Sequence, residues 1–166
     1  FTYIELMDKT TYLNHYYFIS IMSLIMIFLP ANASYSVDSI RKRISYENIP
    51  AYCVDAIKLI IAIVYFYAGL AKLNSDWLLN AYPLKIWLPM SAGIPLVGDL
   101  LRETWVHYTF SWFGALFDLT IPFLLLYKRT RGVAFVLVIV FHLITKILFP
   151  IGVFPFVMIL STTVFF

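Results

Sequence analysis

Several ionisable residues lie inside long apolar stretches of the sequence, where each charged side chain costs about 2.5–3.5 kcal/mol at membrane depth. Lys72 closes one such stretch, in the string AGLAKLNSDW. Helical spacing places Tyr65, Ala68 and Lys72 on one face, with Gly69 beside them. A lysine amine in a low-dielectric pocket loses its proton readily, and the neutral amine can act as a base. The alternative is a lysine that reaches to the membrane surface and pairs with Asp76.

A histidine marks the start of the first apolar stretch, where His15 follows Asn14. An imidazole at this position can donate a hydrogen bond or relay a proton. The alternative is an interfacial histidine in contact with lipid headgroups. Either reading places a titratable ring at the end of a membrane-spanning helix.

A polar stripe runs along one face of the third apolar stretch. His107, Ser111, Gly114 and Asp118 follow the spacing i, i+4, i+7 and i+11, which is typical of one helix face. Because Asp118 lies deep in the stretch, its carboxyl group must be protonated, paired or hydrated. A structural pairing and a chemical role both remain open for it.

Two basic residues, His142 and Lys146, lie one turn apart in the fourth stretch. Two cations side by side in hydrocarbon are unfavourable, so we expect His142 to be neutral and both residues to face the interior. Asp118 is a natural partner for either. We therefore predict a structural polar network that includes Asp118, Lys146 and His107. The sequence has no HExxH or other metal-ligand spacing, so no metal is predicted.

The composition is that of a membrane protein. Of the 166 residues, 62% are hydrophobic and 13% are charged, whereas soluble domains are about one-quarter charged. The single cysteine, Cys53, excludes a disulfide within these residues. The net charge is +3, and because the basic residues flank apolar stretches, the predicted partner is the lipid bilayer and not nucleic acid.

The apolar stretches predict an all-α, polytopic membrane helix bundle of about five spans. The expected spans are residues 15–29, 54–73, 106–127, 132–149 and a last one from residue 151. Residues 74–106 are rich in tryptophan and proline, which favours an interfacial or re-entrant segment. Because the sequence begins at Phe1 without an initiator methionine and stops at Phe166 inside an apolar stretch, we expect a fragment.

The distribution of lysine and arginine predicts the orientation. Successive spans alternate in direction, so the loops that hold Arg41–Arg43 and Lys128–Arg131 lie on one side. The positive-inside rule makes that side cytoplasmic. The helix ends that carry His15 and Lys72 then face the lumen or periplasm.

Several strings resemble the transmembrane part of vitamin K-dependent gamma-carboxylase, a module also called the horizontally transferred transmembrane (HTTM) domain. The resemblance covers nearly the whole sequence, and its most specific strings are AGLAKLNSDW and FPIGVFPFVM. The other matching strings are DKTTYLNHYY (8–17), SYSVDSIRKR (34–43), GALFDLTIPFLLL (114–126) and FHLITK (141–146). The resemblance implies that residues 1–166 are part of an HTTM domain whose upstream span and downstream extracytoplasmic domain lie outside this sequence.

The resemblance also implies a reaction. The family oxidises vitamin K hydroquinone with O2 to the epoxide, and this oxidation drives the addition of CO2 to a glutamate of a protein substrate, which the missing domain would bind. Lys72 occupies the place of the family's catalytic lysine, which deprotonates the hydroquinone. His15 matches the family's functional histidine, and His142 matches a pocket position. Together with Asn14, Tyr65, Ala68 and Gly69, His142 is expected to form the quinol pocket.

The sequence departs from the family's animal members, which carry a second lysine where this chain has Ala71. Two alternatives therefore stay open. One is a non-carboxylating HTTM protein that binds or oxidises quinol, or anchors a partner domain. The other is a transporter in which Asp118, His142 and Lys146 relay protons.

Overall fold

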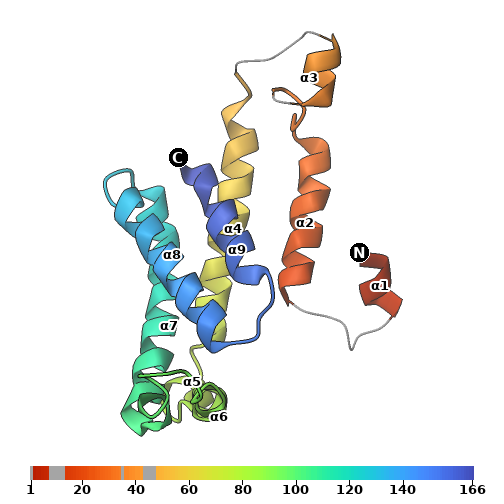
Figure 1. Ribbon diagram of the computed structural model, residues 1–166. Coiled ribbons are helices and arrows are strands. Elements are labelled where there is room, and N and C mark those ends of the chain that lie inside the picture. The colour runs from red at the N-terminus through yellow and green to blue at the C-terminus, as the bar shows by residue number, and fades with distance from the viewer. Residues whose placement is uncertain (1, 8–13, 35, 43–47) are drawn as a thin grey trace. The chain divides into compact units, whose positions relative to one another are not determined.

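The computed structural model describes residues 2–7, 14–34, 36–42 and 48–166, and every regular element in those ranges is helical (Figure 1). The chain divides into two compact units, Phe1–Ile60 and Ile61–Phe166. Helix α4, Ala51–Ala71, is continuous across this division. Each unit is described by itself.

The first unit holds α1 (Thr2–Met7), α2 (Asn14–Phe28), α3 (Val37–Lys42) and the first half of α4. The predicted first span matches α2 to within one residue, and the chain turns at Pro30 directly after it. Proline cannot continue a helix, which explains this end. Helix α3 starts where the Ser36 hydroxyl accepts a hydrogen bond from the backbone N–H of Ser39, at 3.0 Å.

The second unit is built on two antiparallel helices, α7 (Thr104–Leu126) and α8 (Arg131–Leu148), joined by a short turn (Figure 1). The turn is fixed by side chains that donate to carbonyls of the last turn of α7. The Thr130 hydroxyl donates to Leu124 O at 2.7 Å, and Arg131 Nε donates to Leu125 O at 3.0 Å. Helix α9 (Phe154–Thr162) packs against α8 and continues as η3 (Thr163–Phe165).

Residues 74–103 form short helices and no span, as predicted for residues 74–106, whose last three residues already belong to α7. They are α5 (Ser75–Leu78), α6 (Tyr82–Met90) and η2 (Leu100–Arg102). Two non-glycine residues between or beside them, Ala81 and Leu96, have left-handed φ angles of 47° and 72°, which turn the chain sharply. The segment is anchored by an apolar cluster of Leu84, Leu88, Leu101, Val106 and Leu148.

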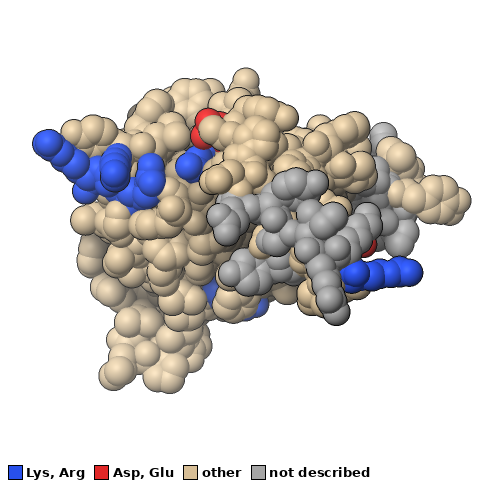
Figure 2. All heavy atoms as spheres, turned by 90° about the horizontal axis from the view of Figure 1, so that it is seen from above, with Lys and Arg blue, Asp and Glu red and all other residues tan. Residues whose placement is uncertain are grey.

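The molecule is an all-α membrane helix bundle, as the sequence predicted. By length and composition, α4, α7 and α8 can each cross a membrane, and Tyr16–Phe28 and Phe154–Phe165 are shorter apolar helices. Large apolar side chains such as Val133, Val140 and Ile147 are exposed on α8, which suits contact with lipid tails. In Figure 2, Lys and Arg gather at the edge that carries the α7–α8 turn, whose basic residues are Lys128, Arg129 and Arg131.

Candidate functional site

A cavity of about 550 Å³ lies within the second unit, between α4, α6, α7, α8 and α9. Its walls are mostly apolar and aromatic, and the rings include Trp77, Trp87, Phe110, Phe141 and Phe149. Tyr65 and Met158 at its closed end are only 2% and 1% exposed, whereas Trp87 and Met90 are 47% and 78% exposed. The cavity therefore opens beside the C-terminal end of α6.

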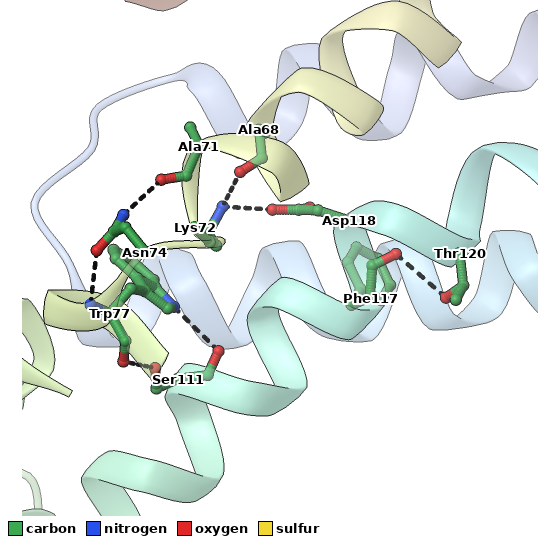
Figure 3. A network of polar contacts seen from close by, with 9 residues as sticks. All are labelled: Ala68, Ala71, Lys72, Asn74, Trp77, Ser111, Phe117, Asp118 and Thr120. Carbon is green, nitrogen blue, oxygen red and sulfur yellow. Dashed lines mark hydrogen bonds and ion pairs between the residues drawn. The ribbon is translucent and has the colours of Figure 1, made fainter. Parts of the chain in front are cut away.

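An ion pair between Lys72 and Asp118 is on the cavity wall (Figure 3). Lys72 Nζ lies 2.5 Å from Asp118 Oδ2, 3.1 Å from the carbonyl oxygen of Ala68 and 5.3 Å from the ring centroid of Trp77. The Lys72 side chain is 19% exposed and that of Asp118 is 7% exposed. A carboxylate, a carbonyl and the face of an indole ring thus surround one amine, and each attracts a cation.

The close approach of α4 and α7 makes this pair possible. A Cβ atom placed on Gly69 would lie 2.9 Å from the backbone nitrogen of Leu119 and 2.7 Å from its Cγ. Real Cβ atoms do not come this near to backbone, so only glycine fits here. Lys72 follows Gly69 by one turn, and Asp118 precedes Leu119, so this contact brings the two charged residues together.

Helix α5, which follows Lys72, is held to α7 by two reciprocal hydrogen bonds. Trp77 Nε1 donates to Ser111 O at 3.0 Å, and Ser111 Oγ donates to Trp77 O at 2.5 Å (Figure 3). Trp112 Nε1 also donates to Leu78 O at 2.7 Å. Ser111 is fully buried, and these bonds fix the indole of Trp77 beside the lysine.

His142 lies on the cavity wall within a group of aromatic rings. Its Nδ1 is 2.8 Å from Val138 O. A carbonyl can only accept, so Nδ1 carries a hydrogen and, in the neutral ring, Nε2 carries the lone pair. The rings of Tyr65, Phe117 and Phe141 lie around it with centroids 5.3 to 6.4 Å away. The histidine is 3% exposed.

The predicted polar network of Asp118, Lys146 and His107 is not formed in the described part of the chain. Asp118 pairs with Lys72 instead, and so Lys72 does not pair with Asp76. Lys146 Nζ donates to Gly152 O at 2.8 Å, and His107 Nε2 is 2.9 Å from Leu101 O. Lys146 and His107 thus each contact a nearby backbone carbonyl, because helix ends and turns leave such carbonyls unpaired.

The structure brings part of the predicted quinol pocket together. Tyr65, Ala68, Lys72 and His142 all line the cavity. Gly69 is beside it and serves the contact between α4 and α7. Asn14 and His15 begin α2, but their side chains lie outside the described part of the structure. Their predicted roles stay predictions.

Sequence reasoning missed two features of this site. One is Trp77, which lies in the tryptophan-rich stretch predicted to be interfacial, although it belongs to the same AGLAKLNSDW string as Lys72. The other is Asp118 as the partner of the lysine. The polar stripe of His107, Ser111, Gly114 and Asp118, all of which are buried in the structure, signals that the Asp118 carboxyl group needs a compensating partner, but it does not say which residue that is.

The fold and site together define an α-helical membrane protein with an apolar cavity that holds one lysine–aspartate pair. The HTTM domain family matches residues 1–166, and the chain therefore belongs to that family. The resemblance noted from the sequence motifs is thus confirmed at the level of the family. A comparison with solved structures finds none that matches this chain.

Proposed function

We propose that this protein is a membrane enzyme of the gamma-carboxylase type, which binds vitamin K hydroquinone in the cavity between α4 and α9. The observation that carries the proposal is the Lys72–Asp118 pair on the wall of an otherwise apolar cavity. Buried ionisable pairs in a ligand-sized cavity are candidates for proton chemistry. Family membership supports the same conclusion.

The few polar groups of the cavity lining indicate that its ligand is a lipid-soluble aromatic molecule. His142 Nδ1, the Thr145 hydroxyl and the Ser91 hydroxyl are each engaged with a backbone carbonyl, and so is Trp77 Nε1. Among the described lining residues, a ligand thus meets aromatic and aliphatic surface except at the Lys72–Asp118 pair, the Tyr65 hydroxyl, which has no hydrogen-bond partner, and His142 Nε2. Cavities with a few polar groups in an apolar lining orient their ligands through those groups. A flat ring with a hydroxyl group fits this lining.

The bound hydroquinone, on reaction with O2, would supply the strong base that removes a proton from a substrate glutamate before CO2 adds to it. The chain's own contribution is to orient the ring between aromatic side chains, to exclude water and to handle the hydroxyl proton at the Lys72–Asp118 pair. His15 is proposed to act in the glutamate step. The glutamate-containing protein substrate would bind through a domain beyond these residues.

The reaction gives a direct test with the full-length protein in lipid nanodiscs. We expect incorporation of labelled CO2 into a glutamate peptide when reduced vitamin K and O2 are present. Lys72→Ala should abolish it, whereas Lys85→Ala should not, because Lys85 is exposed, lies 3.4 Å from Tyr108 Oη and is not among the residues that line the cavity. Equal incorporation by wild type and Lys72→Ala would reject the assigned site.

The same assay separates carboxylation from the simpler alternative. Consumption of hydroquinone without incorporation of CO2 would identify a quinol-oxidising HTTM protein that does not carboxylate. If the wild type neither binds nor oxidises hydroquinone, the proposed function is wrong. Binding can be measured independently by equilibrium dialysis with radiolabelled vitamin K.

We also propose an orientation in the membrane. The basic loops at Arg41–Arg43 and Lys128–Arg131 are assigned to the cytoplasmic side by the positive-inside rule. The end of the second unit that carries α5, α6 and the cavity mouth then faces the lumen or periplasm. This side would give an exported protein substrate access to the site.

A further inference from the structure

Two polar groups at the closed end of the cavity have no hydrogen-bond partner in the described part of the chain. One is the hydroxyl group of Tyr65, a residue that is only 2% exposed. The other is His142 Nε2, whose lone pair is free because Nδ1 donates the ring hydrogen to Val138 O. Both side chains line the cavity, and their ring centroids are 5.9 Å apart. Because buried polar groups are nearly always paired, two unpaired groups on a cavity wall indicate that a ligand supplies their partner.

The neighbouring hydroxyl group of Thr162 does not supply the missing hydrogen. Thr162 lies beside Tyr65, but its hydroxyl donates to Met158 O at 2.7 Å. Its one hydrogen is therefore not available to the Tyr65 oxygen or to His142 Nε2. The closed end of the cavity thus presents lone pairs that require a hydrogen-bond donor.

The spacing along α4 relates this end of the cavity to the ion pair. Tyr65 lies two turns before Lys72 on the same face of the helix, a separation of about 10 Å along the helix axis. One aromatic ring with oxygen atoms at opposite positions spans such a separation when each oxygen forms a hydrogen bond. A ring whose first oxygen contacts the Lys72–Asp118 pair would therefore present its second oxygen to Tyr65 and His142.

We propose, on the basis of the proposed function, that Tyr65 and His142 bind the second hydroxyl group of an aromatic diol and so select the reduced ligand over its quinone. A hydroxyl group can donate to His142 Nε2 and accept from the Tyr65 hydroxyl. A quinone oxygen can only accept, so it leaves the buried Nε2 unpaired, which weakens binding. An oxidised product that lacks this hydroxyl is also bound more weakly, and this difference favours its release.

Three naphthols test the proposal without turnover. They are 1,4-dihydroxynaphthalene, 4-methoxy-1-naphthol, whose second oxygen can only accept, and 1-naphthol, which has no second oxygen. Their dissociation constants are measured by equilibrium dialysis against the full-length protein in nanodiscs, without oxygen and with excess reductant. We expect the diol to bind at least about tenfold more tightly than either of the other two. Equal affinities for the diol and the methoxy compound would overturn the proposal.

Two variants separate the contributions of the two side chains. Tyr65→Phe removes a donor that both oxygenated compounds use, so it should weaken the diol and the methoxy compound alike. His142→Phe removes the acceptor that only the diol uses, so it should abolish the preference for the diol. A preference that survives His142→Phe would overturn the assignment. Tyr67→Phe is the matched control, because Tyr67 is also in α4 but is 65% exposed and does not line the cavity.

Failure of the proposed function gives a different result. In that case none of the three compounds would bind to the wild type above the level found with empty nanodiscs. 1-Naphthol also reports on the variants, because it has no oxygen to place at the closed end and should bind to them as it binds to the wild type. The comparison of the three compounds within the wild type does not depend on the stability of any variant.

Discussion

A single lysine side chain connects three parts of the second unit. Its amine touches α4 through the Ala68 carbonyl, α7 through Asp118 and α5 through the ring of Trp77. The side chain of Asp118 is only 7% exposed, so water screens this pair weakly. Removing one partner of such a pair leaves the other charge unpaired, whereas removing both partners leaves an apolar contact.

This contrast predicts the outcome of a double-mutant cycle. Lys72→Met should lower the free energy of unfolding by about 3 kcal/mol, near the lower end of the range for buried pairs, because Lys72 is partly exposed. The double variant Lys72→Met/Asp118→Leu should return to within about 1 kcal/mol of wild type. Reversible unfolding in mixed micelles provides the measurement. A single variant as stable as wild type would contradict the pairing.

Part of the residue-scale picture could be predicted from the sequence. Lys72, Asp118 and His142 stand out because charged or polar residues are rare at membrane depth. The partner of Asp118 could not be predicted, because Lys72 is 46 positions away and His142 and Lys146 on α8 are equally suitable candidates. The choice depends on how α4 and α7 approach each other, and a single sequence does not contain that geometry.

At the scale of elements, the contact of α4 with α7 at Gly69 sets the position of the ion pair. The two backbones lie against each other here, because a Cβ atom placed on Gly69 would lie only 2.9 Å from the backbone nitrogen of Leu119. Small residues permit such close helix packing in membranes. Any side chain at position 69 must push the two helices apart.

Gly69→Ala is therefore expected to lower stability by roughly 1–3 kcal/mol, the usual cost of overpacking. Gly132→Ala is the matched control, because it lies in α8 and a Cβ there meets nothing within 4 Å. That control should be neutral or should stabilise by up to about 1 kcal/mol, since alanine favours helix. Thermal unfolding of both variants measures the difference. If the two behave alike, the close approach of the helices is refuted.

The helices themselves were largely predictable. Helices α2, α4, α7 and α8 begin and end within three residues of the predicted spans. The lengths of the apolar stretches and the positions of Pro30 and Pro150 predict where these helices begin and end. The division of residues 74–106 into α5, α6 and η2 could not be predicted, because it depends on left-handed residues such as Ala81 that carry no sequence signal of their own.

At the scale of the whole molecule, the charge distribution makes the proposed orientation testable. Cys53, the chain's single cysteine, is 2% exposed, so introduced cysteines can be labelled against a low background. Gly93 follows α6, and Tyr127 begins the α7–α8 turn; both are exposed. These positions lie at opposite ends of α7.

In intact cells, Gly93→Cys should react with a membrane-impermeant maleimide, whereas Tyr127→Cys should react only after permeabilisation. The positive-inside rule supplies the physical reason, since Lys128, Arg129 and Arg131 hold the turn on the cytoplasmic side. Mass spectrometry of the labelled protein gives the readout. The reverse pattern would invert the proposed orientation.

The tryptophan rings at the cavity wall should make the fluorescence of the protein sensitive to a bound quinone. The centroids of Trp77 and Trp87 are 6.5 Å apart, and both rings line the cavity. A quinone accepts electrons from an excited indole at contact distance, so an occupied cavity should quench the tryptophan fluorescence of the protein. Trp87→Phe should remove much of this response, and Trp105→Phe should leave it unchanged, because Trp105 is outside the cavity lining. The intrinsic fluorescence of the protein thus measures whether the cavity is occupied, without any attached dye.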